Sequence, residues 1–169
     1  MIKDPITFLV VCFAMLSCSP KTFYDHERLS FKVSDGFKIG KNNTWKKNQA
    51  TYIRMNINGR NSEEYISMTW LPNKYELHKE LDNFVQARIE RWESDSTVVV
   101  EFGEIISTTF ASNPALQRNY QVAEQGIAGS YIVFNCKELT IIVGAHFNAA
   151  TQAASINCLQ TIQESISCK

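Results

Sequence analysis

The chain has 169 residues, with 17 Lys and Arg, 17 Asp and Glu, and a formal net charge of zero. This neutral composition lacks the basic surplus on which nucleic-acid binding depends, so it argues against nucleic acid as a partner. The length suits one domain with a single hydrophobic core.

The first twenty residues contain the most apolar part of the sequence, Ile6–Leu16. A bilayer-spanning helix needs about 20 apolar residues, so this shorter run predicts a cleaved export signal. The segment Met15–Cys18 resembles a bacterial lipobox, in which a lipid is attached to the cysteine and the peptide is cut just before it. The alternative is a buried N-terminal strand in which Cys18 has no role.

We therefore expect a signal peptide at residues 1–17, a polar tether at residues 18–28 and a single domain at residues 29–169. Lipidation of Cys18 predicts a protein anchored in the bacterial cell envelope, with its domain in the periplasm and the outer membrane as the expected site. Several acyl chains make such anchoring durable, because a single chain binds membranes only marginally.

Three cysteines remain for the domain once Cys18 is acylated: Cys136, Cys158 and Cys168. They allow at most one disulfide and leave one thiol over, and their spacing does not choose the pair. Three reduced thiols are the alternative. The absence of a CxxC motif argues against a zinc ribbon or a thioredoxin-type redox centre.

Charge is unevenly distributed along the chain. Residues 32–60 carry seven basic residues and one acidic residue, whereas residues 61–104 carry ten acidic and four basic residues. The two segments either face and neutralise each other, or give the folded protein a dipole that orients it on an anionic partner. In the third interpretation, the two charged segments form solvated surfaces that bind no specific partner.

Alternating apolar and polar residues predict several strands in the first half. The strands are expected at Leu29–Val33, Phe37–Ile39, Thr51–Asn58 and Glu64–Leu71, with a turn at Ser34–Gly36 and a polar loop at Gly40–Ala50. A helix follows at Lys74–Glu93, because apolar residues recur at helical spacing, and Asn73 and Glu76 have capping-box spacing.

The second half predicts an antiparallel meander and a final helix. Strands are expected at Val98–Phe110, with a bulge near Gly103, and at Leu116–Ala123, Ser130–Asn135 and Leu139–Phe147. A turn is expected at Ser112–Pro114. The final helix has Ile156, Leu159, Ile162 and Ile166 on one face, with Asn148 as its expected cap.

This order of elements resembles the PsbP-like family. The resemblance lies in Leu29–Phe37, Leu81–Val85, Phe110–Ala115 and Tyr131–Val143. It implies an α+β fold, in which an antiparallel sheet of six to seven strands is covered by helices as an α/β/α sandwich, and a domain that acts mainly through protein contacts. A fold does not fix a function, however.

No motif commits the chain to a reaction. GxSxG, GxGxxG, the P-loop and HExxH are all missing, which favours a non-catalytic protein without a metal or cofactor. His26 lies between acids at the end of the tether, and His78 and Asp82 are spaced as an exposed helix pair. We expect His146 to be a hydrogen-bonded histidine at a strand end.

The loop from Gly40 to Ala50 is the best candidate for recognition, because its lysines could attract an anionic group while its indole supplies contact area. The candidate residues are Lys41, Trp45, Lys46 and Lys47. We therefore expect a lipid-anchored, non-catalytic protein that binds an envelope protein or an anionic surface. The alternative is a hydrolase or small-ligand-binding protein that uses a pocket between sheet and helices.

Overall fold

The protein is described by a computed structural model that covers residues 22–40, 43–45, 49–57, 64–93, 98–122, 125–148 and 152–169. The strands are β1 (Phe23–Asp25), β2 (Leu29–Lys32), β3 (Phe37–Ile39), β4 (Asn43–Trp45), β5 (Ala50–Ile57), β6 (Tyr65–Leu71), β7 (Glu101–Phe110), β8 (Asn113–Val122), β9 (Ile127–Cys136), β10 (Leu139–Asn148) and β11 (Ser167–Cys168). The helices are α1 (Leu77–Glu93) and α2 (Gln152–Ser165).

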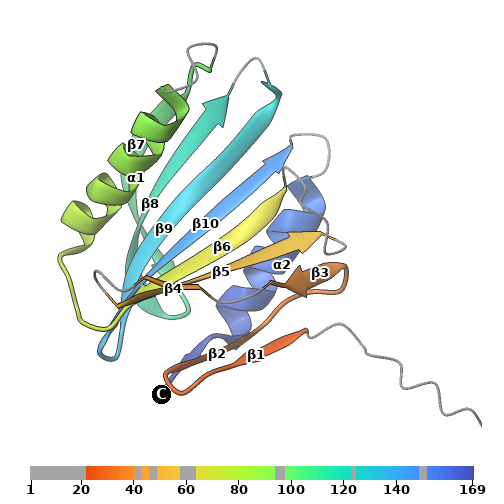
Figure 1. Cartoon of the computed structure of the whole chain (residues 1–169), viewed down its shortest axis with the longest axis vertical. Helices are drawn as coiled ribbons and strands as arrows, with labels where there is room; N and C mark the ends of the chain where they lie inside the picture. Colours follow the sequence, from red (N-terminus) through yellow and green to blue (C-terminus); the bar gives the residue numbers. More distant parts are fainter. Residues whose placement is uncertain are drawn as a thin grey trace, which may run out of the picture.

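Eight of these strands form one antiparallel sheet in the order β3-β5-β6-β10-β9-β8-β7, with β4 also paired to β5. The two helices lie on opposite faces of this sheet (Figure 1). Neighbouring residues on one strand show this, because Ile141 packs in the same core cluster as α2 and Ile142 in the same cluster as α1. The α+β class and the layered arrangement predicted from the sequence are confirmed.

The sheet has more strands than the six or seven predicted, because part of the expected loop at Gly40–Ala50 is a strand. Within that loop, β4 pairs with the start of β5, so that Asn43 lies opposite Tyr52 and Trp45 opposite Ala50. A three-residue edge strand in polar sequence carries too little hydrophobic periodicity to be recognised.

Strand β1 lies inside the segment that was predicted to be a tether. It pairs with β2 in a second, three-stranded sheet of order β1-β2-β11. Tyr24 is buried, and its ring packs on Phe31 and Trp70 with centroids 5.0 and 5.7 Å apart. The folded region therefore begins before residue 29, since burial of this ring fixes β1 against the core.

The structure confirms the predicted helix α1, the turn at Ser34–Gly36 and the bulge of β7, with a small difference at the start of the helix. Helix α1 begins at Leu77, and the backbone N–H of Glu80 donates to the carbonyl of Glu76, so Glu76 precedes the helix in place of the predicted Asn73. At the predicted Ser34–Gly36 turn, the N–H of Phe37 donates to the carbonyl of Ser34, and Gly36 has a φ of 91°. The predicted bulge is confirmed as a register shift between Phe102 and Ile105.

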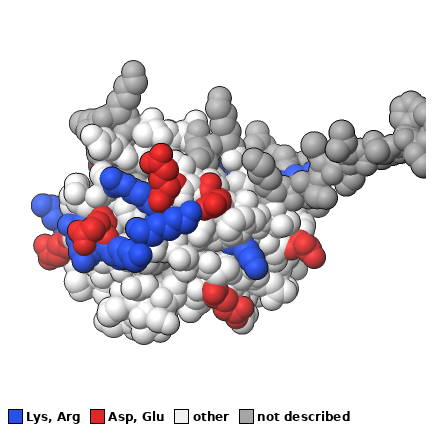
Figure 2. Space-filling model, turned by 90° about the horizontal axis from the view of Figure 1, so that it is seen from below, with Lys and Arg blue, Asp and Glu red and all other residues white. Residues whose placement is uncertain are grey.

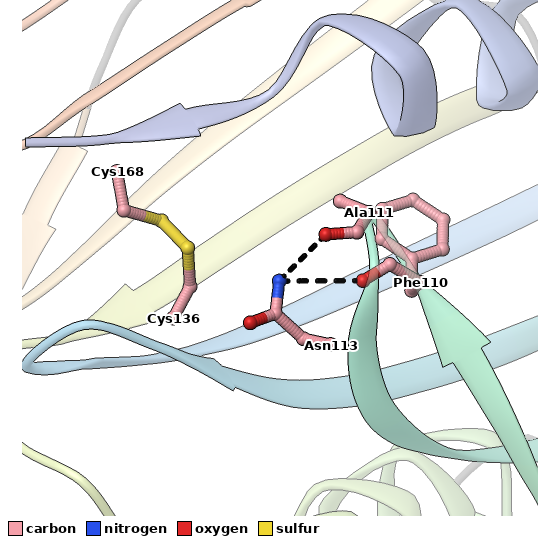
Figure 3. Close-up of a disulfide and its surroundings, with 5 residues drawn as sticks. All are labelled: Phe110, Ala111, Asn113, Cys136 and Cys168. Atoms are coloured by element: carbon pink, nitrogen blue, oxygen red, sulfur yellow. Dashed lines mark hydrogen bonds between the residues drawn. A yellow bond between two sulfur atoms is a disulfide. The ribbon is translucent and has the colours of Figure 1, made fainter.

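The β7–β8 turn begins one residue earlier than predicted, at Ala111, and ends at Ser112 instead of Pro114. Ala111 and Ser112 form it with positive φ angles of 50° and 63°, and Asn113 already belongs to β8. The Asn113 side-chain amide donates to the carbonyls of Phe110 and Ala111 (Figure 3). These bonds stabilise the left-handed backbone of the turn.

A disulfide joins Cys136, at the end of β9, to Cys168 in β11 (Figure 3). It links the β9–β10 hairpin to the C-terminal strand across a sequence separation of 32 residues. Cys158 of α2 is the thiol left over, and burial raises its pKa. The pairing that the sequence left open is therefore Cys136 with Cys168.

Charged side chains of both signs are interspersed on the face seen from below (Figure 2). Lys74 forms an ion pair with Glu138 at 3.3 Å, and Arg118 approaches Asp82 at 3.9 Å. Both pairs are at least partly exposed, so each contributes little to stability. In the described part of the chain, neither helix combines the length and the apolar character needed to cross a membrane.

Candidate functional site

The site residues predicted from the sequence fall largely outside the described residues. The structure does not describe four of these predicted site residues, which are Cys18, Lys41, Lys46 and Lys47. Trp45 is the last residue of β4, where its backbone pairs with Ala50 of β5. The expected recognition loop is thus placed only through β4, which runs along the first half of β5.

The α1 side of the sheet has one covered and one less covered half. Helix α1 packs against β8 and β9, and no described helix lies on that side over β5 and β6 (Figure 1). On β5, Ile53 and Met55 point into the α2-side core, so Tyr52 and Arg54 point to the α1 side. Both of these side chains are half-buried.

A pocket of about 330 Å³ lies between β5 and α1 on this side. Its lining residues are Tyr52, Phe84, Ala87, Arg88 and Arg91. The four helical residues follow one another at spacings of three, one and three, which gathers them on the flank of α1 that faces β5. We call this space, together with Arg54 beside it, the arginine pocket.

Three arginines act on one phenol in the arginine pocket. Burial raises the pKa of Tyr52, whereas the positive charges of Arg88, Arg54 and Arg91 oppose that increase. All three guanidinium groups therefore lie within electrostatic reach of the Tyr52 hydroxyl. Arg54 and Arg88 are half-buried, and positive charges partly withdrawn from water attract anions more strongly than the same charges on an open surface.

Two of the arginines are held in place by aromatic rings. The guanidinium of Arg54 lies 3.8 Å from the ring centroid of Tyr65, and its Nε donates to Oδ1 of Asn56 at 2.7 Å. The guanidinium of Arg88 lies 5.2 Å from the ring centroid of Phe84. Cation–π contacts of this kind orient a planar guanidinium before any ligand arrives.

His146 lies behind Tyr65 in the same stack, with ring centroids 4.9 Å apart. Burial and, to a smaller extent, the positive charges of Arg54 and Arg88 lower the pKa of His146 to about 4. The imidazole is therefore neutral near pH 7. It forms a hydrogen bond through Nδ1 with the hydroxyl of Tyr120, as expected for a histidine at a strand end.

A glycine makes the bond between Tyr120 and His146 possible. Strand β9 lies between β8 and β10, and its Gly129 is paired with Tyr120 of β8 on one side and with His146 of β10 on the other. A Cβ at Gly129 would lie 2.3 Å from the Tyr120 hydroxyl oxygen. Only a residue without a side chain lets the phenol cross β9 and reach the imidazole.

Within the part of the chain that the structure describes, the neighbours of His146 and His78 do not form a catalytic arrangement. The aromatic neighbours of His146 are Tyr65, Trp92 and Tyr120, which supply neither a carboxylate nor a nucleophilic serine. His78 is exposed, and the ion pair of Asp82 is with Arg118 on β8 rather than with His78. Among the described residues, no group of three or more His, Cys, Asp and Glu side chains could hold a metal ion.

A larger groove of about 660 Å³ lies on the other side of the molecule, between α2 and the β7–β8 turn. Ile156, Leu159 and Ile166 form its apolar part, and its charged lining residue is Glu164. By volume alone, this groove would be preferred to the arginine pocket as a binding site. The arginine pocket is the better candidate site, because it gathers charged groups of one sign beside oriented rings, whereas this groove offers a shallow mixed surface.

Comparison with known proteins supports the fold and assigns no residue role. No protein-family model matches the chain, and no curated protein sequence matches it. Among solved structures it is similar to CyanoP, the cyanobacterial PsbP of Synechocystis sp. PCC 6803, with a TM-score of 0.55. The match has 10% sequence identity and covers 87% of this chain and 91% of that chain. The chain therefore has a PsbP-like fold, as the resemblance predicted.

Proposed function

We propose that this chain is a non-catalytic lipoprotein, anchored by lipid at Cys18 in the bacterial cell envelope and expected at the outer membrane. Its PsbP-like domain binds a protein or another anionic component of the envelope. The observation that carries the proposal is the pocket in which Arg88 and Arg91 of α1 lie beside Tyr52, whose phenol is also influenced by the charge of Arg54, on the half of the α1 side that no described helix covers.

The described part of the predicted recognition loop is β4, which pairs with β5 beside this site. Strand β4 lies between Lys41 and Lys46 in the chain, and its Asn43 pairs with Tyr52 of the arginine pocket. Directly opposed residues of an antiparallel pair share one face of the sheet. The proposed partner surface therefore joins the loop residues Lys41, Trp45, Lys46 and Lys47 to the arginine pocket.

Crosslinking in the native membrane tests the partner-binding function. We expect simultaneous replacement of Lys41, Trp45, Lys46 and Lys47 with Ala to reduce crosslinking to the main neighbour by at least about tenfold, since several charge-assisted contacts are lost. The matched control replaces three exposed lysines and one aromatic residue elsewhere with Ala: Lys32, Lys74, Lys79 and Tyr75. An unchanged neighbour profile in the loop variant would contradict the proposed surface.

Anchoring is tested separately, on the full chain extracted from membranes. Mass spectrometry should find an acylated Cys18 at the mature N-terminus, and a Cys18→Ala variant should leave the membrane fraction. An unmodified Cys18 thiol in the membrane-bound protein would contradict the lipoprotein assignment.

A second candidate function is small-ligand binding in the arginine pocket. The specific observation in its favour is the pocket volume of about 330 Å³, at the lower end of the range for small-molecule sites. The hydrolase form of this alternative lacks support, because no acid and nucleophile are aligned with His146 among its described neighbours.

A further inference from the structure

The arginine pocket combines two kinds of surface that point to one kind of ligand. Tyr52, Phe84 and Ala87 supply ring and methyl surface, and Arg88 and Arg91 supply guanidinium groups. We propose that this pocket binds a small phosphate monoester, with its phosphate on the arginines and an aromatic or apolar organic part against the two rings. The inference deepens the second candidate function and rests on it.

The charge of the site favours a phosphate over a carboxylate. Arg88 and Arg91 of α1 line the pocket together with Tyr52, and the charge of Arg54 on β5 also acts on this phenol. The pocket lining itself contains no acidic residue among those described. A phosphate monoester carries nearly two negative charges at neutral pH, whereas a carboxylate carries one, so the phosphate gains more from several arginines.

The arginines are oriented before binding, which lowers the entropy cost of recognition. The Tyr65 ring and the Asn56 side chain hold Arg54, and the Phe84 ring lies under Arg88. A guanidinium offers a planar fork of donors that matches two phosphate oxygens at once, unlike the ammonium of a lysine. Arg88→Lys should therefore weaken binding although it conserves the charge.

The walls and the size of the pocket restrict the organic part. The volume of about 330 Å³ accommodates a single ring with its phosphate. A ring against Tyr52 and Phe84 gains aromatic contact and removes apolar surface from water. Phenyl phosphate presents both features and is the probe that we would use.

Calorimetric titration of the full chain, purified in detergent, tests the inference. We expect phenyl phosphate to bind at least about tenfold more tightly than benzoate or inorganic phosphate, because each lacks one of the two recognised parts. Arg91→Gln should lower the affinity for phenyl phosphate by at least about tenfold. Arg91 is exposed, so this variant keeps its fold, and Lys79→Gln removes one exposed charge from the same helix as the control.

Each contrary result overturns a stated part of the inference. Equal affinity for benzoate overturns the assignment of a phosphate, and equal affinity for inorganic phosphate overturns the role of the two rings. No saturable binding of phenyl phosphate, or an Arg91→Gln variant that binds like the native chain, overturns the site. Crosslinking of the loop variant reports on partner binding independently, so failure of the pocket and failure of the partner surface are distinguishable.

Discussion

The two faces of the main sheet are built from alternate residues of the same strands, yet they differ in chemistry. Toward α2, Ile53 and Met55 of β5 are fully buried in a continuous apolar core. Toward α1, Tyr52 and Arg54 alternate with them in sequence; both are half-buried, and Tyr52 lines the pocket between β5 and α1. A step of one residue along β5 therefore separates a side chain buried in the apolar core from one that is half-buried on the α1 side.

The difference between the faces also explains where the helices lie. Helix α2 contributes the buried residues Cys158 and Ile162 to a core that spans most of the sheet. Helix α1 contributes Leu81 and Val85 to a smaller cluster over β8 and β9, and its other flank carries Arg88 and Arg91. Helix α2 therefore covers the core on its side of the sheet, whereas helix α1 covers a smaller cluster and also forms one wall of the arginine pocket.

The largest expected effect comes from opening the α2-side core. Phe134 is fully buried, and its ring centroid lies 5.0 Å from that of Phe110. Phe134→Ala should lower the free energy of unfolding by about 3–5 kcal/mol, because it leaves a cavity in close-packed surroundings. Urea denaturation measures this. Ile106→Ala on β7, where the side chain is 46% exposed, should cost much less; equal losses would contradict the assignment of the core.

The disulfide is the next largest contribution, and it links the two sheets. Replacing Cys136 and Cys168 with Ser should lower the free energy of unfolding by about 3–4 kcal/mol for a closed loop of this length. The melting temperature should fall by roughly 10 °C. Reductant should lower the melting temperature of the native chain similarly and leave that of the double variant unchanged. No effect of reductant on the native chain would contradict the disulfide.

On the α1 side, stability should depend on pH through His146. Its pKa in the folded state is about 4, below the value of 6.5 for the free side chain, so the unfolded chain binds the proton first as pH falls. This contribution to stability is complete above about pH 6.5 and falls by up to about 3 kcal/mol toward pH 4.

The pH dependence is measured by urea denaturation at several pH values. The difference between the native chain and a His146→Gln variant isolates this group from the carboxylates. A His78→Gln variant, changed at an exposed histidine, should behave like the native chain. Parallel pH profiles for the native chain and His146→Gln would contradict the burial of a neutral imidazole.

Elements with strong local periodicity could be predicted from the sequence. The helical stripe of α1 and the apolar strands β9 and β10 appear where they were expected. The short strands β1, β4 and β11 were missed, because two to three residues carry too little pattern and depend on distant partners. The Cys136–Cys168 bond likewise depends on tertiary approach, which spacing does not encode.

The arginine pocket could not be predicted, because its parts come from β5 and α1, which meet only in the fold. In the sequence, Arg88 falls within the apolar stripe of α1, next to Ile89, so its position does not distinguish it from a residue that packs on the sheet. A local signal did exist: Phe84, Ala87, Arg88 and Arg91 form a mixed aromatic and basic flank at helical spacing. That flank differs from the solvent-facing side of an ordinary amphipathic helix, which is polar throughout.

The central claim is that binding takes place on the α1 side of the sheet, in the arginine pocket. Backbone amide NMR shifts of the full chain in detergent, followed during titration with phenyl phosphate, test it most directly. The account predicts that the largest changes occur at Tyr52, Arg54, Arg88 and Arg91, with smaller changes at His146. Changes centred on the α2 groove, at Ile156 and Leu159, or no saturable change at all, would contradict it.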